Sequence, residues 1–471
     1  MCSQILKNMK ILIYNWAPLD LNIGGGVAVY VKNILDYLSK AADNNHIDVV
    51  FLSAGYYYDN SKKTYVRKDN NYKGYSVYTI INSPVIAPNG FPEKLYSHIL
   101  DDEVLVKVIR NFIKESGPYD AIHFNSLEGL SPQVLSLKAD FPNTIFVHSM
   151  HDYGVFCPRV QFWTKDNENC VRNKALHLCS KCMAEFQVLP VNILKRLRPS
   201  DCSNNRISLG IRMLRKFLIK TQIMTFINPA QEVTYKKYRK ACIDNINNYV
   251  DKELVVSKRV GDIAKIYGVN PNIVKVSYIG TKVADTALGH NRNSPYSETL
   301  TLLYMGYMSK MKGFYYYLSI LDELDDKVAS RIDLKFATKI SDVNAYKHIL
   351  SLKSKFHDIV FYDGYTHSDF PKIMENVNLG IVPPLWEDNL PQVTIEMIAN
   401  GIPVITSNNG GAHELNTHPG FVFISKSDCI NKINKIANDR KLLEDYWDYS
   451  VPLTTMEQHV EQLIDVYSGL S

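Results

Sequence analysis

The sequence predicts an α/β protein built from two Rossmann-like, doubly wound parallel sheets. Short runs of β-branched and aromatic residues alternate with longer helical patterns almost from end to end, and this alternation occurs twice. Several of the runs are apolar throughout, which is typical of strands that helices cover on both faces. The chain has 471 residues, whereas a single hydrophobic core stops growing at roughly 250 to 300 residues. We therefore expect two domains.

The predicted strands fall into two groups separated by a turn-rich segment. The first group comprises residues 10–16, 47–53, 119–125, 144–149, 223–228 and 253–257. The second group comprises residues 299–306, 332–338, 358–362, 379–383, 402–407 and 420–424. Polar residues with glycine and proline at 285–298 predict the linker between the groups. The expected boundaries are an N-terminal domain at residues 1–288 and a C-terminal domain at residues 289–450.

The composition is that of a globular protein. Hydrophobic residues make up 46% and charged residues 21% of the chain, which argues against disordered, collagen-like and coiled-coil proteins. No apolar run approaches the ~18 residues that a membrane-spanning helix needs. The first residues show no secretory signal. We expect a cytoplasmic protein that does not cross a bilayer by itself.

The net charge of +5 is unevenly distributed. Residues 151–250 contain 17 lysines and arginines against 7 aspartates and glutamates, a local net charge of +10. Within this stretch a helical stripe of apolar residues is flanked by basic ones, at Ile207, Ile211, Leu214, Leu218, Arg212, Arg215, Lys216 and Lys220. Such a pattern is typical of a basic helix on an anionic membrane surface, or of a core-facing helix with a solvated basic face.

A row of three glycines follows the first predicted strand and precedes a predicted helix. Gly24, Gly25 and Gly26 would let the backbone approach a ligand, and the helix N-terminus offers free N–H groups to a phosphate. The row matches neither a Walker loop nor G-x-G-x-x-G, so a plain turn from strand to helix explains it equally well.

Two acids stand eight residues apart after a predicted strand in the second half. Asp388 lies at a loop or helix start and Glu396 about two turns further on, so both carboxylates could face one ligand. Carboxylates accept hydrogen bonds from vicinal diols, as in dinucleotide sites. Taken alone, the two acids are also explained by a helix N-terminus and a solvated helix face.

The segment from Glu387 to Glu414 resembles the nucleotide-sugar-binding region of GT-B glycosyltransferases. The likeness is to family four, glycosyl transferases group 1, of the bacterial polysaccharide-biosynthesis kind. It rests on the acid-x7-acid pair, the run Glu-Met-Ile-Ala-Asn-Gly-Ile-Pro-Val and the sequence Gly-Gly-x-x-Glu. Further matches follow in order at residues 24–26, 151–153, 254–258, 280, 305–313 and 361–364.

The resemblance implies roles for individual residues. Glu396 would bind the ribose hydroxyls and Lys312 the diphosphate, although Lys312 alone could be a solvated turn lysine. His151, at the end of a predicted strand, would contact the donor sugar near the reacting carbon. Tyr307 departs from the family pattern because it stands where an arginine is common. The catalytic candidates are His151, Lys312 and Glu396, and the donor-binding candidates are Gly25, Gly26, Tyr307, Glu387, Asp388, Asn389, Gly410, Gly411 and Glu414.

The first acid of the pair is ambiguous. The eight-residue spacing selects Asp388, whereas the residue type favours Glu387, and the sequence does not decide between them.

Four cysteines cluster in the basic part of the N-terminal domain, in an insertion expected at about residues 155–222. Cys157, Cys170, Cys179 and Cys182 include one C-x2-C pair. A cytosolic protein keeps such thiols reduced. Four thiolates can complete a structural zinc site, although the gap between the first two cysteines is looser than in usual zinc ribbons. Zinc and four free thiols therefore stay open as alternatives.

The resemblance implies a retaining glycosyltransferase that moves a sugar from a nucleotide-sugar donor to an acceptor hydroxyl. The expected acceptor is a lipid-linked or growing cell-surface glycan, reached on the inner face of the cell membrane. The chemistry would need no metal or other cofactor, because Lys312 and a helix N-terminus can neutralise the leaving diphosphate. Residues 451–471 would pack back onto the N-terminal domain. The alternatives are a nucleotide-sugar epimerase of the same fold and a non-catalytic basic binding protein. Nucleic acid is not an expected partner, because no RNA-binding signature is present.

Overall fold

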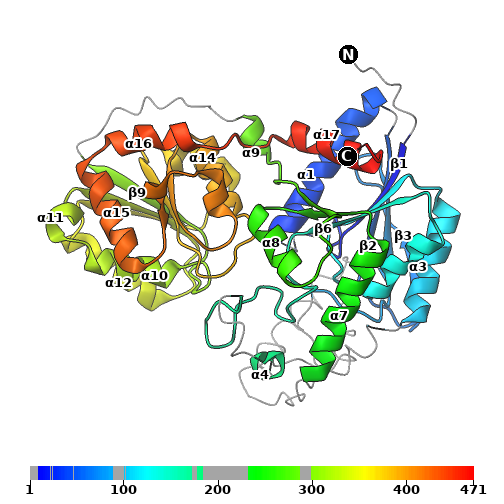
Figure 1. The fold of residues 1–471 in the computed structure, drawn as a ribbon. Coiled ribbons are helices and arrows are strands. Elements are labelled where there is room, and N and C mark those ends of the chain that lie inside the picture. Colours follow the sequence, from blue (N-terminus) through cyan, green and yellow to red (C-terminus); the bar gives the residue numbers. More distant parts are fainter. Residues whose placement is uncertain are drawn as a thin grey trace.

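The computed structural model describes residues 9–21, 23, 25–45, 47–88, 100, 102–171, 178–183, 232–286 and 299–470. Two lobes make up this part of the chain, each built around one sheet (Figure 1). The lobe of the first sheet is called the N-terminal domain and the lobe of the second sheet the C-terminal domain. The basic stripe at residues 207–220 and the predicted strand at 223–228 lie outside the described residues.

Within the described ranges the first sheet has eight strands in the order β3-β4-β2-β1-β5-β6-β7-β8. Neighbouring strands are parallel except for the antiparallel pair β3 and β4. The strands are β1 Met9–Tyr14, β2 Ile47–Ala54, β3 Tyr65–Lys68, β4 Ser76–Ile81, β5 Ala121–Phe124, β6 Ile145–Met150, β7 Lys252–Val255 and β8 Val274–Val276.

The second sheet has six described strands, all parallel, in the order β11-β10-β9-β12-β13-β14. They are β9 Leu300–Met305, β10 Ile332–Thr338, β11 Asp358–Asp363, β12 Leu379–Val382, β13 Val404–Ser407 and β14 Val422–Phe423. Every residue of β9 and β12 is buried, as the continuous apolar runs predicted. The predicted fold class, two doubly wound α/β domains, is confirmed.

The described helices of the N-terminal domain are α1 Gly25–Asn45, α3 Glu103–Ser116, α4 Cys179–Met183, α7 Glu232–Tyr249, α8 Lys258–Ile266 and α9 Lys282–Asp285. Those that follow the second sheet's first strand are α10 Phe314–Glu323, α11 Asp326–Ala329, α12 Val343–Ser351, α13 Phe370–Met374, α14 Gln392–Ala399, α15 Lys426–Asn438, α16 Lys441–Asp445 and α17 Met456–Tyr467. Short 3₁₀ helices are Pro132–Ala139, Leu352–Ser354, His367–Asp369, Ala412–Leu415, Pro419–Phe421 and Tyr446–Tyr449. Among all of these, none is long and apolar enough to cross a membrane.

Three strands, β3, β4 and β8, were not predicted. Each lies at or next to an edge of the first sheet, and β3 and β8 have few buried residues. An edge strand with a wet face lacks the continuous apolar run that marks a central strand. The predictions therefore found the centre of this sheet and missed its borders.

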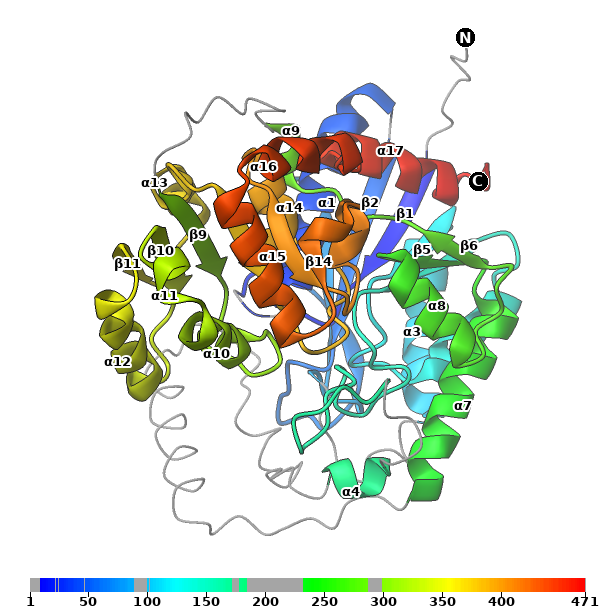
Figure 2. The same ribbon diagram turned by 60° about the vertical axis from the view of Figure 1, so that its left-hand side comes forward.

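The last helix returns to the N-terminal domain. Figures 1 and 2 show α17 running from the C-terminal domain to lie beside α1. Its entry point is fixed by Asp285 of α9, whose Oδ1 accepts the backbone N–H of Met456 at 2.7 Å. Thr455 also forms a bridge with Thr281. The chain thus returns from the C-terminal domain next to the place where it leaves the N-terminal one.

Candidate functional site

Lys312 and Asp388 lie together at the carboxyl end of the second sheet. Lys312 follows β9 and Asp388 follows β12, and the loops after adjacent parallel strands meet at one edge of the sheet. The Lys312 Nζ lies 2.7 Å from Asp388 Oδ2 and 5.1 Å from the centre of the Trp386 ring. Asp388 is buried, whereas the lysine side chain is about one third exposed (34%). The lysine therefore places a partly exposed ammonium beside a buried carboxylate.

Glu396 lies on α14 and is buried. Its Oε1 is 3.2 Å from Nε2 of His367. Burial raises the pKa of Glu396, and the neighbouring His367 opposes this rise. His367 follows β11 at the same edge of the sheet, and its side chain is 66% exposed. The sequence reasoning missed His367, although its place just after a strand is the signal that drew attention to His151.

Glu387 turns away from Lys312, toward the N-terminal domain. Its carboxylate accepts two hydrogen bonds from Arg259, Nε to Oε2 at 2.8 Å and Nη2 to Oε1 at 2.9 Å. Asn169 Nδ2 donates to Oε1 at 2.9 Å and the Gly410 N–H to Oε2 at 3.2 Å. Burial would raise the pKa of Glu387, but these donors together hold it below its usual value. Of the two adjacent acids, Asp388 is therefore the one that pairs with Lys312.

Gly410 and Gly411 hold the acid-bearing loop by close packing. Gly410 has φ +69°, and a Cβ there would lie 1.9 Å from the carbonyl oxygen of Asp388. A Cβ on Gly411 would lie 2.3 Å from the carbonyl oxygen of Asn389 and 2.6 Å from Cβ of Ser257. The structure thus gives both glycines a reason independent of any ligand: they let three segments of backbone meet.

Glu414 contacts the N-terminal domain as well. Its two carboxylate oxygens accept the backbone N–H groups of Lys258 and Arg259 at 2.8 and 2.7 Å. Tyr278 donates its hydroxyl to the same carboxylate at 2.8 Å. A carboxylate at the start of α8 satisfies free N–H groups and complements the helix dipole. The structure therefore places Glu414 at a helix terminus of the opposite domain.

Asn389 is buried, yet both polar atoms of its amide lack a hydrogen-bond partner among the described residues. Within the same part of the chain, Thr394 Oγ1 and Trp386 Nε1 are also buried without a partner. Buried polar groups are nearly always hydrogen-bonded, so such a group calls for an explanation. Atoms of this kind around the acid-bearing loop are suited to bind the hydroxyl groups of a ligand.

The paired glycines face the C-terminal domain at the start of α1. The carbonyl of Gly26 accepts a hydrogen bond of 3.4 Å from Gln392 Nε2, at the start of α14. Gly25 has φ +58° and nothing crowds its missing Cβ. Tyr307, in the loop after β9, is 73% exposed. Gly24 lies outside the described residues.

His151 lies in the N-terminal domain, just after β6. Its Nε2 is buried and has no hydrogen-bond partner within the described ranges. Burial, with a smaller contribution from His459 and His148, lowers the pKa of His151 to about 3, so the ring is neutral near pH 7. The ring of Tyr30 packs against it, with 4.6 Å between ring centres. A neutral imidazole with an unused nitrogen can exchange hydrogen bonds with a sugar.

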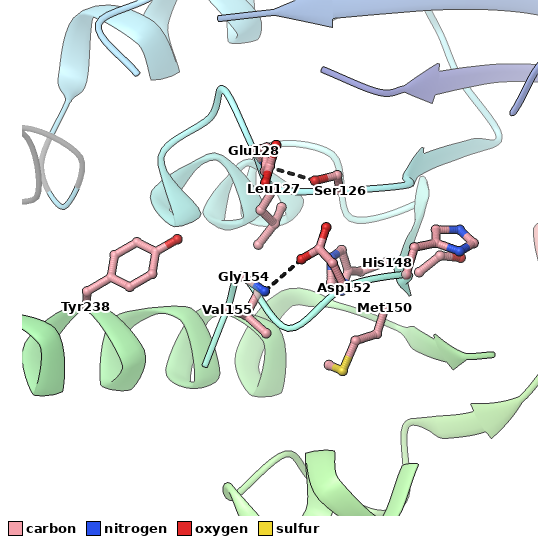
Figure 3. Close-up of a pocket in the computed structure, with 11 residues that line it drawn as sticks. Ser126, Leu127, Glu128, His148, Met150, Asp152, Gly154, Val155 and Tyr238 are labelled. Atoms are coloured by element: carbon pink, nitrogen blue, oxygen red, sulfur yellow. Dashed lines mark hydrogen bonds between the residues drawn. The ribbon is translucent and has the colours of Figure 1, made fainter. Parts of the chain in front are cut away.

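A small pocket adjoins His151, between the loops after β5 and β6 and helix α7 (Figure 3). Polar groups of Glu128, His148 and Asp152 line it, with Tyr238 on its α7 side. Asp152 Oδ1 accepts the Gly154 N–H at 2.7 Å, and burial raises the pKa of this aspartate. Asp152 belongs to the segment 151–153, which the family resemblance includes.

The four clustered cysteines are free thiols in this structure. Burial raises the pKa of Cys157 to about 12 and of Cys170 to about 11. Arg239 Nη2 lies 3.3 Å from Sγ of Cys179. In the described part of the chain no group of three or more histidine, cysteine or acidic side chains is arranged to hold a metal ion. The zinc site at Cys157, Cys170, Cys179 and Cys182 stays a prediction.

Comparisons with known proteins agree with the fold. Residues 288–450 match the family model described as glycosyl transferases group 1. A stretch of 119 residues is 29% identical to spore coat protein SA of Bacillus subtilis (strain 168), and covers 24% of this chain and 32% of that protein. The chain therefore matches about a third of the length of this curated relative.

Two solved structures share the architecture over nearly the full length. Sucrose-phosphate synthase from Thermosynechococcus elongatus superposes with a TM-score of 0.55 at 15% identity, over 98% of this chain and 99% of that one. The Anabaena protein HepE in complex with UDP and glucose superposes with a TM-score of 0.52 at 13% identity, over 98% and 100%. At these identities the likeness concerns the fold, which is GT-B.

Proposed function

We infer that this chain, whose residues 288–450 form a glycosyl transferases group 1 domain within a GT-B fold, transfers a sugar from a nucleotide-sugar donor to an acceptor. The observation that carries this inference is the arrangement of Lys312, Asp388 and Glu396 in the matched domain. A lysine, an acid paired with it and a second buried acid all lie at the carboxyl edge of one sheet. In open α/β sheets ligands bind at this edge.

The proposed donor site divides the work among these side chains. Lys312 binds the diphosphate and leaves Asp388 when the donor arrives, because the two negative charges of the diphosphate attract an ammonium more strongly than one carboxylate does. Glu396 accepts hydrogen bonds from the ribose hydroxyls. Asp388 and the unpartnered amide of Asn389 then bind the sugar. The complex of HepE with UDP and glucose supports a nucleotide-sugar donor through its shared fold.

The proposed reaction retains the anomeric configuration and needs no metal at the chemical step. As the bond to the donor sugar breaks, negative charge grows on the leaving diphosphate. Lys312 neutralises that charge, assisted by the free N–H groups at the start of α10 directly after it. The leaving phosphate accepts the proton of the acceptor hydroxyl, and neutral His151 contacts the donor sugar from the N-terminal side.

The proposed acceptor is a glycan or a lipid-linked sugar bound against the N-terminal domain. Polar side chains of Glu128, His148 and Asp152 cluster beside His151, and they support an acceptor on this side because sugar hydroxyls require such groups. The charge of residues 151–250 supports an acceptor at an anionic membrane surface. We propose a peripheral association with the inner face of the cell membrane.

A panel of nucleotide sugars tests the proposed function through thermal unfolding. A ligand that binds the native state at 100 times its Kd stabilises it by about 2.7 kcal/mol, so at least one donor should raise the melting temperature. Product analysis with that donor then separates the reactions. A transferase releases the nucleotide only when an acceptor is present, whereas an epimerase isomerises the sugar nucleotide alone. If no nucleotide or nucleotide sugar stabilises the chain, the proposal is wrong.

A further inference from the structure

Charged groups from both domains meet around the carboxylate of Glu387. Arg259 of α8 grips both oxygens, and Asn169 from the cysteine-containing loop adds a third hydrogen bond. The Gly410 N–H supplies the fourth. Glu387 is fully buried, although it projects from a loop of the C-terminal domain toward residues of the N-terminal one.

A second contact between the domains lies beside the first. Arg259 gives its side chain to Glu387 and its backbone N–H to Glu414. One residue at the start of α8 therefore binds two carboxylates of the opposite domain. We call Arg259, Asn169, Glu387 and Glu414 the interdomain clasp.

The clasp satisfies Glu387 completely. Within the described part of the chain, each carboxylate oxygen accepts at least two hydrogen bonds, one from the planar fork of Arg259 and one from a neutral donor. A buried ion pair of this kind stabilises only with such complete hydrogen bonding, and removal of one partner leaves a costly unpaired charge. In this arrangement both carboxylate oxygens of Glu387 are already hydrogen-bonded within the protein and are not available to a donor sugar. Its neighbour Asp388 instead faces the candidate donor site.

The backbone after Glu387 is held just as tightly. The Asp388 carbonyl accepts the Gly411 N–H at 2.8 Å, and Gly410 leaves no room between its own Cα and this carbonyl. With the Glu387 side chain pulled toward Arg259, the next side chain in the chain leaves the backbone on another side and reaches Lys312. The direction of Asp388 is thus tied to the direction of Glu387.

We infer that Arg259 and Asn169 of the N-terminal domain are positioning residues of the donor site in the opposite domain: by gripping Glu387 they aim Asp388 at Lys312. This inference rests on the proposed function for its effect on the donor. The clasp itself rests on the contacts between the domains alone. It also means that the complete donor site exists only while the two domains hold each other as they do in this structure.

The test compares the full-length chain with Arg259→Gln, Glu387→Gln and the double variant. Arg110→Gln is the matched control, because it removes an arginine of the N-terminal domain that pairs with Asp140 of the same domain. Two quantities are measured for each protein: the affinity for UDP-glucose by calorimetry and the radius of gyration by small-angle X-ray scattering. A cooperative melt for each variant establishes that it folds.

Each single clasp variant should bind UDP-glucose about 10- to 100-fold more weakly, because a misdirected Asp388 loses its charged hydrogen bond to the donor. The double variant should bind UDP-glucose no more weakly than whichever single variant has the lower affinity. The radius of gyration should increase in both single variants and in the double variant. Arg110→Gln should match the wild type. Unchanged affinity in Arg259→Gln overturns the inference. Losses that add in the double variant also overturn it, because they mean that Glu387 touches the donor itself.

The two proposals fail in different ways. If UDP-glucose does not bind the wild type, the proposed function fails for this donor. The radius of gyration alone then tests whether the clasp holds the two domains together. An increased radius of gyration in Arg259→Gln and Glu387→Gln then supports it, and an unchanged radius in both overturns it.

Discussion

At the scale of single residues, the two acids Glu387 and Glu396 have opposite surroundings. Hydrogen-bond donors around Glu387 hold its pKa down, whereas Glu396, nine residues further on, is buried beside an exposed histidine and has a raised pKa. A carboxylate with complete hydrogen bonding is structural in character. Among the residues that the structure describes, the buried Glu396 carboxylate has one partner, His367 at 3.2 Å, and it therefore has capacity for a ligand. This contrast makes Glu396 the acid to test first.

Glu396→Gln should lower kcat/KM with the identified donor by about 10- to 100-fold, because a hydrogen bond to a charged group contributes about 1.5–3 kcal/mol. The amide keeps the size of the side chain, and a raised pKa means that the charge is not needed for folding, so the melting temperature should stay within about 2 °C. Initial rates and a thermal melt measure the two effects. Glu461→Gln, on the exposed face of α17, is the control. Full activity in Glu396→Gln would remove this acid from the site.

At the scale of elements, α17 closes the N-terminal domain with buried histidine contacts. His459 Nε2 lies 2.6 Å from the hydroxyl of Tyr30, and Tyr467 places its hydroxyl 2.6 Å from Nδ1 of His123. Tyr30 in turn packs against His151. The last helix of the chain is therefore connected to a candidate catalytic residue through one tyrosine.

These contacts predict a loss of stability in acid. Burial lowers the pKa of His459 from 6.5 to about 4, with Tyr30 as its hydrogen-bond partner and the candidate residue His151 nearby. Between pH 6.5 and 4, His459 binds a proton in the unfolded chain but stays neutral in the folded chain. The contribution is therefore complete above pH 6.5 and is lost as the pH falls toward 4, by about 1.4 kcal/mol per pH unit.

Urea unfolding at pH 7, 6 and 5 measures this slope. In the His459→Gln variant the glutamine keeps a hydrogen-bond partner for Tyr30 but does not titrate. The free energy of unfolding of this variant should therefore fall less steeply with decreasing pH, by the contribution of one histidine, about 1.4 kcal/mol per pH unit. The buried His123, whose pKa is also lowered, continues to titrate in both proteins. Equal slopes in the variant and the wild type would contradict the role assigned to His459.

At the scale of the whole molecule, the proposed site draws residues from both domains. Lys312, Asp388 and Glu396 belong to the C-terminal domain and His151 to the N-terminal one, while the clasp and the return of α17 join the domains. The segment before α9 and the segment before α17 meet where Thr281 pairs with Thr455. A change in the angle between the domains would act on the donor-site acids and on the contacts of α17 together.

The membrane proposal belongs to this scale as well. Liposome flotation with vesicles that contain anionic lipid should recover the wild type, and should recover less of a variant with Arg212, Arg215 and Lys216 changed to glutamine. Each cation near an anionic surface contributes about 1 kcal/mol, so binding should weaken roughly 100-fold. Zwitterionic vesicles serve as the control. Equal flotation of both proteins on anionic vesicles would sink the membrane proposal.

The sequence by itself determined the fold class and the central strands. Continuous apolar runs favour strands that helices cover on both faces, so local composition indicated β9 and β12, in which every residue is buried. The spacing of Asp388 and Glu396 after a predicted strand also drew attention to these two acids, whereas Lys312 was named through the family resemblance. The wet edge strands β3 and β8 carry no such signal.

Only the tertiary structure decided which acid faces which partner. Glu387 and Asp388 are adjacent in the sequence, and their separation into a clasp residue and a partner of Lys312 depends on Arg259, 128 residues away. His367 reaches Glu396 across 29 residues in the same way. Local propensities set the strands and helices, but the direction of a charged side chain is set by whichever opposite charge the fold brings within 3 Å.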